Sequence, residues 1–211
     1  MLTDGAREPI AVLAIGQSNM LGKYGPAGHT ISDRVQVWVD RSWRRAVLGE
    51  PPFQRDRTNN EAANNLAFVF ATKLAEHEQR DVRLVLLASD GKRIEFFLPN
   101  TVLRRNEWEN NQRSRSFGTS LADEIFGVSG AATTCLHDLG KSHFDIVLIH
   151  QGEANFAPVA EYPWVYRDKV KALIQEFHQR KLTSGSTQFI LGHINPRYHF
   201  AREPRAALLP L

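Results

Sequence analysis

The sequence contains little cysteine and no long apolar run. Cys135 is the single cysteine among 211 residues, so an intrachain disulfide is excluded and nothing in the chain requires an oxidising compartment. No apolar run approaches the ~18 residues of a membrane-spanning helix. The N-terminus carries Asp4 and Glu8 instead of the positively charged region of a signal peptide. We therefore expect a cytoplasmic protein without membrane association, with secretion as the open alternative.

The sequence also lacks a dense stretch of positive charge. The net charge is +3, and the arginines are scattered, whereas nucleic-acid binders concentrate basic residues in a patch or stripe. No GxGxxG or P-loop pattern that would cradle phosphates is present. A solvated basic face is the expected result, and nucleic acid is not an expected partner.

Apolar runs alternate with helical patterns along the whole chain. The expected strands are residues 9–15, 35–39, 82–88, 144–150 and 187–194. Amphipathic stripes predict three helical segments: Ala63, Leu66, Ala67, Phe70 and Leu74; Leu121, Ile125, Val128, Ala132, Cys135 and Leu139; and Tyr166, Val170, Leu173 and Phe177. Gly127 and Gly130 suggest two shorter helices in the second segment, and Pro163 suits the first turn of the third.

This alternation predicts a single α/β domain over residues 1–211, with a mainly parallel five-stranded sheet covered by helices on both faces. The polar stretch 100–118 is expected to be a long surface loop, and loops of that size are often functional.

Three of the predicted strands end in unusual polar segments. The first is followed by residues 16–20 (GQSNM), the third by residues 89–91 (SDG), and the fourth by residues 150–153 (HQGE). Because ligands bind beyond the carboxyl ends of the strands in open α/β sheets, we expect these segments to meet on one rim.

The segments resemble a known family. GQSNM with the following Gly22, the stretch 89–99 with its Gly and Ile-Glu pair, and HQGE occur in this order in the SGNH hydrolases, in the branch of sialate O-acetylesterases and acetylxylan esterases. The resemblance covers about residues 9–195. It implies a three-layer, flavodoxin-like α/β/α fold and a serine carbohydrate O-acetylesterase that needs no cofactor.

Ser18 is the nucleophile that the resemblance implies. A serine hydroxyl needs an exposed position and a nearby base, and a turn between a strand and a helix exposes it. Taken alone, a serine in such a turn more often caps the helix. The resemblance assigns the oxyanion to the backbone N–H groups of Ser18 and Gly91 and the side-chain amide of Gln151. Gly91 also fits a turn that requires a positive φ.

Other polar residues on the rim are expected to support the site. We expect Gln17 and Asn19 to brace the turn of the nucleophile, and Glu153 to brace the loops or orient a histidine rather than contact the substrate. His150 ends a buried strand and is expected to be structural. Histidines 143 and 150 bracket a strand of roughly 20 Å and could not share an ion, so no metal site is predicted.

The catalytic base is the least defined group. The family keeps its histidine in an Asp-x-x-His arrangement after the last strand, whereas His199 here has Pro196 three residues before it. Either the chain is truncated, or His199 is recruited as the base, or the protein is not an active hydrolase. The main hypothesis is an esterase acting on an acetylated carbohydrate of sialate or xylan type. The alternative is a catalytically impaired relative that binds a glycan or a protein, and nucleic-acid association is a weaker third.

Overall fold

The computed structural model describes residues 7–21, 32–47, 65–89, 91–99, 121–156 and 163–192. Its centre is a six-stranded sheet with the order β3-β2-β4-β1-β5-β6. The strands are β1 (Ile10–Gly16), β2 (Val35–Val39), β3 (Ser42–Arg45), β4 (Val82–Ala88), β5 (Ile146–His150) and β6 (Gln188–Leu191). All neighbouring pairs are parallel except β2 and β3. The predicted mainly parallel α/β fold is confirmed, with six strands in place of five.

The additional strand, β3, forms a hairpin with β2. The two residues between them, Asp40 and Arg41, have φ values of 50° and 59°. Positive φ at both positions is typical of the two-residue turns that match the twist of paired strands. The sequence Ser-Trp-Arg-Arg has no apolar run, because β3 is a partly exposed edge strand. For that reason the hydrophobic pattern did not predict it.

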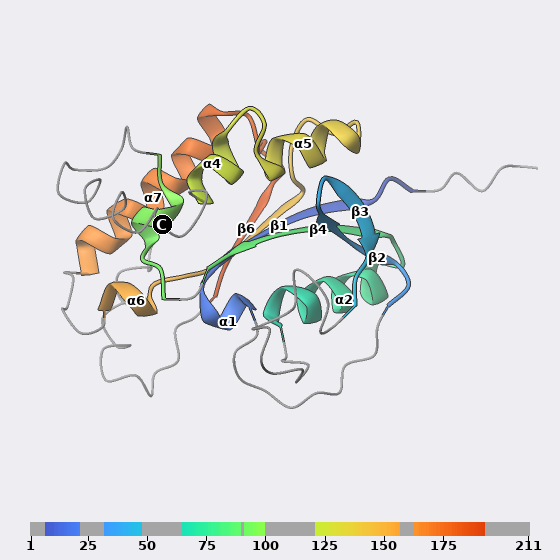
Figure 1. Ribbon diagram of the computed structural model, residues 1–211, viewed down its shortest axis with the longest axis horizontal. Coiled ribbons are helices and arrows are strands. Elements are labelled where there is room, and N and C mark those ends of the chain that lie inside the picture. The colour runs from blue at the N-terminus through green and yellow to red at the C-terminus, as the bar shows by residue number, and fades with distance from the viewer. Residues whose placement is uncertain are drawn as a thin grey trace, which may run out of the picture.

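Helices cover both faces of the sheet, as Figure 1 shows. On one face lie α1 (Ser18–Leu21) and α2 (Leu66–Glu78), and on the other lie α4 (Leu121–Phe126), α5 (Ala131–Asp138) and α7 (Pro163–Gln179). A 3₁₀ turn, η1 (Ile94–Phe97), packs beside α4 and α7, and the short α6 (Glu153–Phe156) follows β5. Each face has its own hydrophobic core, so the molecule has three layers.

The predicted stripe of α7 is confirmed, because Tyr166, Val170, Leu173 and Phe177 are all buried in one core. The predicted break between α4 and α5 is also confirmed. Val128, however, lies in that break with 93% of its surface exposed, so its place in the stripe was wrong.

Helix α2 matches its prediction in part, because Ala67 is buried and Phe70 and Leu74 are partly buried against the core, whereas Leu66 is not. The helix begins after Asn65, whose side chain accepts a hydrogen bond from the Phe68 N–H at 2.9 Å. Its buried residues are Ala67, Phe68, Ala71, Thr72 and Ala75, while Leu66 is exposed. The small alanines allow the helix to lie close to the sheet. Ala63 and the stretch 100–118 lie outside the described residues.

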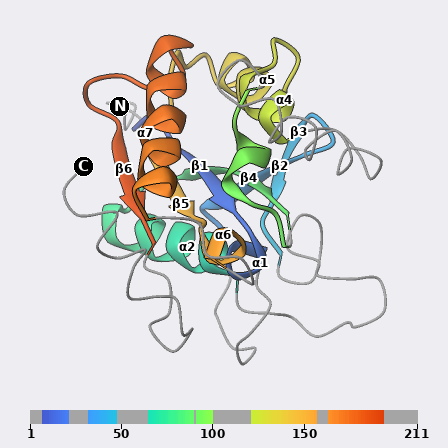
Figure 2. The same cartoon turned by 90° about the vertical axis from the view of Figure 1, so that its left-hand side faces the viewer.

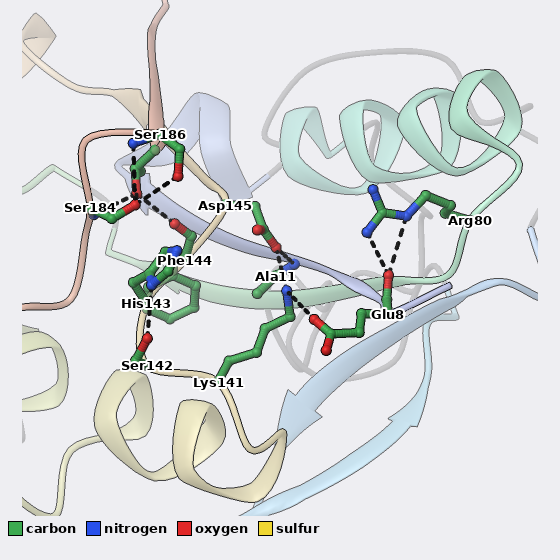
Figure 3. Close-up of polar contacts among 11 residues, drawn as sticks. Glu8, Ala11, Arg80, Lys141, Ser142, His143, Phe144, Asp145, Ser184 and Ser186 are labelled. Atoms are coloured by element: carbon green, nitrogen blue, oxygen red, sulfur yellow. Dashed lines mark hydrogen bonds and ion pairs between the residues drawn. The ribbon is translucent and has the colours of Figure 1, made fainter. Parts of the chain in front are cut away.

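The amino end of β1 is held by the polar contacts of Figure 3. The Asp145 carboxylate accepts hydrogen bonds from the Ala11 N–H at 2.7 Å and from Lys141 Nζ at 2.9 Å. The Asp145 N–H in turn donates to the Ala11 carbonyl at 2.9 Å. These bonds align β1 with β5 from one end, so the polar segments at the other end follow a fixed register.

Within the described residues no helix is long and apolar enough to cross a membrane.

Candidate active site

The three polar segments predicted from the sequence leave the same edge of the sheet. Gly16 at the end of β1 is in register with Ala88 of β4 and with His150 of β5. Ser18 follows Gly16 by two residues, Gly91 follows Ala88 by three, and Gln151 follows His150 directly. The side chains of Ser18 and Asn19, and the whole of His199, lie outside the part of the chain that the structure describes. Their predicted roles therefore stay predictions.

The turn before Ser18 depends on Gly16. A Cβ atom at this position would lie 2.3 Å from the His150 carbonyl oxygen, so only glycine fits between β1 and β5. The Gln17 carbonyl then accepts hydrogen bonds from the N–H groups of Met20 and Leu21, at 2.9 and 3.1 Å. These bonds turn the chain out of the strand at once, so that Ser18 is the first residue of α1.

Glu153 connects this turn to the segment after β5. Its Oε2 accepts a hydrogen bond from Gln17 Nε2 at 2.7 Å, and its Oε1 lies 3.4 Å from His150 Nδ1. The Ala154 N–H donates to Gln17 Oε1 at 3.4 Å. Figure 2 shows α1 and α6 side by side at this end of the sheet. Glu153 thus contacts both segments, with His150 buried beside it.

Gln151 connects the segment after β5 to the segment after β4. Its Nε2 donates to the Lys92 carbonyl at 2.7 Å, and its Oε1 accepts from the Gly152 N–H. An amide nitrogen carries two hydrogens, so the bond to Lys92 leaves a second one for another acceptor. Gln151 as a whole is held among protein atoms and is only 3% exposed.

Two glycines in these segments have a left-handed backbone. Gly91 has a φ of 63° and Gly152 a φ of 134°, conformations that other residues rarely adopt. Gly91 is exposed, and among the described residues beyond its chain neighbours no heavy atom lies within 4 Å of where its Cβ would be. Glycine is therefore required here for its backbone conformation, as the turn interpretation predicted.

A set of buried polar residues beside the site was not predicted from the sequence. The Asn155 side chain forms hydrogen bonds with two residues of η1, Ile94 and Glu95, and Lys169 of α7 donates a hydrogen bond to Glu95. The Tyr166 hydroxyl, also on α7, donates to the Gln151 carbonyl. The Ile-Glu pair was noted in the sequence, but nothing in the local pattern indicated its partners.

The described residues at this edge contain no candidate metal centre. Among the described residues no group of three or more His, Cys, Asp or Glu side chains is arranged to hold an ion. The described polar groups at this edge are backbone N–H groups and the amides of Gln17 and Gln151. Fixed donors of this kind stabilise the negative charge that develops on oxygen during acyl transfer.

Known proteins resemble this chain over most of its length. Residues 10–207 match the family described as carbohydrate esterase, sialic acid-specific acetylesterase. None of the curated proteins matches the chain significantly in sequence.

Solved structures share the fold at low sequence identity. A protein from Arabidopsis thaliana has a TM-score of 0.60 and 18% identity, over 96% of this chain and 82% of its own. A carbohydrate acetylesterase from Xanthomonas citri has a TM-score of 0.55 and 15% identity, over 94% of this chain and 47% of its own. NanS has a TM-score of 0.54 and 15% identity, over 96% of this chain and 72% of its own. At these identities the structural likeness concerns the fold alone.

Proposed function

The chain belongs to the carbohydrate esterase family of sialic acid-specific acetylesterases, and from this premise we propose that it removes O-acetyl groups from a carbohydrate by serine chemistry. The Ser18 hydroxyl attacks the acetyl carbonyl, and a base takes its proton. The sugar hydroxyl leaves with a proton, and water then releases acetate from the acetylated serine. Each step passes through a tetrahedral oxyanion that needs fixed donors.

The proposed donors are the N–H groups of Ser18 and Gly91 and the second amide hydrogen of Gln151. The observation that carries this proposal is the chain of contacts between the three segments. Glu153 joins the turn of Ser18 through Gln17, and Gln151 joins the segment of Gly91 through Lys92. These contacts restrict the relative movement of the segments, which favours a preorganised site.

The proposed substrate is an acetylated sugar of sialate or xylan type, and the charge near Gly91 favours the sialate type. Lys92 and Arg93 follow Gly91 directly. The Lys92 ammonium lies 5.0 Å from the centre of the Phe96 ring, and Arg93 is exposed. With Asp90 directly before Gly91, residues 89–93 carry one acidic and two basic side chains, and this positive excess would attract the carboxylate of an acidic sugar, whereas neutral xylan gains nothing from it.

The proposed base is His199, which lies within the span that matches the family. The second candidate function is a catalytically impaired protein that binds a glycan or another protein. It is favoured by Pro196, which occupies the position of the aspartate in the Asp-x-x-His arrangement. General base assistance is commonly worth about a hundredfold to ten-thousandfold in rate, so the two candidates differ greatly in expected turnover.

The test of the nucleophile is hydrolysis of an aryl acetate by wild type and Ser18→Ala. Loss of the nucleophile should leave only the residual rate that the oxyanion donors provide. Ser186→Ala is the matched control, because Ser186 is an exposed loop residue before β6, at the opposite end of the sheet. Equal hydrolysis by wild type and Ser18→Ala would refute the serine mechanism.

His199→Ala, assayed on the same ester, tests the base. Turnover abolished by the change would support His199 as the base, and turnover that survives would assign the base to another group. A wild-type protein that binds acetylated sugars without hydrolysing them would establish the second candidate. Parallel assays on O-acetylated sialic acid and acetylated xylan then identify the sugar.

A further inference from the structure

Three polar side chains form a buried unit between η1, α6 and α7. Asn155 is fully buried and Glu95 is 5% exposed, while the Lys169 side chain is 11% exposed. They come from three segments of the chain that are up to 74 residues apart. We call these residues the Asn155–Glu95–Lys169 unit.

Asn155 uses both ends of its amide. Its Oδ1 accepts a hydrogen bond from the Ile94 N–H at 2.9 Å, and its Nδ2 donates to Glu95 Oε2 at 3.1 Å. Lys169 Nζ donates to Glu95 Oε1, which completes an ion pair. These side-chain bonds attach the two short segments, α6 and η1, to the long helix α7.

The ion pair is costly to bury, which argues against a role in stability alone. Removing two charges from water is so unfavourable that well-packed apolar residues are often as stable or more stable. One role that such pairs have in some proteins is to specify a single arrangement of the chain. The arrangement specified here is that of η1 against α6.

Both segments held by the unit carry a proposed oxyanion donor. Ile94 is three residues after Gly91, and Asn155 is four residues after Gln151. The Asn155 N–H also donates to the Gly152 carbonyl at 3.0 Å. From α7, the Tyr166 hydroxyl donates to the Gln151 carbonyl. Each donor segment is thus held to the unit or to α7 by a short path of hydrogen bonds.

We propose that the Asn155–Glu95–Lys169 unit, together with Tyr166, positions Gly91 and Gln151 relative to one another so that both donors reach the same oxyanion. This inference rests on the proposed esterase function and adds positioning residues to it. None of the four residues is assigned contact with the substrate. Their effect is therefore expected in the transition state, where the oxyanion develops.

The first experiment compares Asn155→Ala with wild type on an aryl acetate. Loss of one oxyanion donor typically lowers kcat about a hundredfold to a thousandfold, and a displaced donor should lose part of that. We expect kcat to fall about tenfold to a hundredfold with KM within about twofold, since the lost interaction exists only in the transition state. Hydrogen exchange at the Ile94 N–H should accelerate.

Val170→Ala is the matched control. Val170 neighbours Lys169 on α7 but is buried in the hydrophobic core, so its truncation destabilises the same helix without touching the unit. We expect a lower melting temperature with kcat within about twofold of wild type. If Asn155 had a purely structural role, Asn155→Ala would likewise lower the melting temperature and leave kcat within about twofold of wild type.

Tyr166→Phe keeps the inference testable if Asn155→Ala does not fold, because it removes one hydroxyl and preserves the ring. We expect kcat to fall about threefold to tenfold at constant KM. If both variants fold, their combined effect on kcat should be smaller than the product of the single effects, since residues acting as a unit are not additive.

The outcomes separate this inference from the proposed function. A wild-type protein without esterase activity would overturn both. An active wild type whose Asn155→Ala and Tyr166→Phe variants keep kcat within twofold of Val170→Ala would overturn this inference alone. A fall in kcat confined to the unit variants, at constant KM, supports it.

Discussion

Replacement of Gly16 by alanine should disturb both the sheet and the site. The new Cβ would lie 2.3 Å from the His150 carbonyl oxygen and 3.0 Å from Met20 Cβ. Real Cβ atoms essentially never come closer than 3.0 Å to such a neighbour, so β1 and β5 must separate locally by at least 0.7 Å, the difference between the two distances. The obstructing atom is a backbone oxygen at the end of the neighbouring inner strand, so a rotamer change cannot relieve the contact.

The free energy of unfolding should fall accordingly. Overpacking typically costs about 1–3 kcal/mol, and a clash with backbone belongs at the upper end, about 3 kcal/mol. For a chain of this size each kcal/mol lowers the melting temperature by about 2–4 °C, so Gly16→Ala should melt about 6–12 °C below wild type. Because the movement also displaces Ser18 from Gln151, kcat on an aryl acetate should fall about tenfold or more.

The measurement is thermal unfolding followed by circular dichroism, with Gly185→Ala as the control. Among the described residues beyond its chain neighbours, no heavy atom lies within 4 Å of the position that a Cβ would take at Gly185, so the melting temperature of Gly185→Ala should differ from wild type by less than about 2 °C. A Gly16→Ala protein that melts within 2 °C of wild type would show that β1 and β5 accommodate the methyl group, and would refute the steric argument.

Two further predictions concern single side chains. Glu153→Gln replaces the charge-assisted hydrogen bond between Glu153 and Gln17 by a neutral one, and a charge-assisted bond is roughly twice as strong. The melting temperature should therefore fall by a few degrees, and kcat should fall by about threefold to tenfold. An unchanged kcat on the aryl acetate would contradict the bracing role. Burial raises the pKa of the Cys135 thiol from 9.0 to about 12. Above pH 9 the unfolded chain therefore releases a proton that the folded chain keeps, and the free energy of unfolding falls as the pH rises. Between pH 8 and 10, urea unfolding should show wild type losing about 1.4 kcal/mol more than Cys135→Ala, and equal losses would contradict the burial of the thiol.

The central strands and the long helix could be predicted because their patterns are local. Every residue of β1 is buried, as expected for an inner strand of a parallel sheet with both faces covered. The stripe of α7 repeats at helical spacing and is wholly buried. Polar segments directly after such strands must leave the sheet at its carboxyl edge, which is why Ser18, Gly91 and Gln151 could be assigned to one rim in advance.

Elements with weak or interrupted patterns were harder to predict. The β3 strand is partly exposed and its turn carries Asp40 and Arg41 where glycine is usual, so neither hydrophobicity nor turn chemistry indicated a hairpin. In α2, the choice of buried face depended on how closely the helix approaches the sheet. That distance is set by tertiary packing, which favoured Ala67, Ala71 and Ala75 over the larger Leu66.

The partners of the buried polar groups were decided by the tertiary structure alone. Gln17 and Glu153 are 136 residues apart, and Glu95 and Asn155 are 60 apart. Hydrophobic periodicity reports which face of an element is buried, but it contains no information on which distant polar group will meet another. Those pairings form only when the strands are in register and the helices are packed, because a buried donor or acceptor must then find a partner within hydrogen-bonding distance. The residue types of the candidate site are thus written in local sequence, whereas the bonds that hold them in place depend on the folded chain.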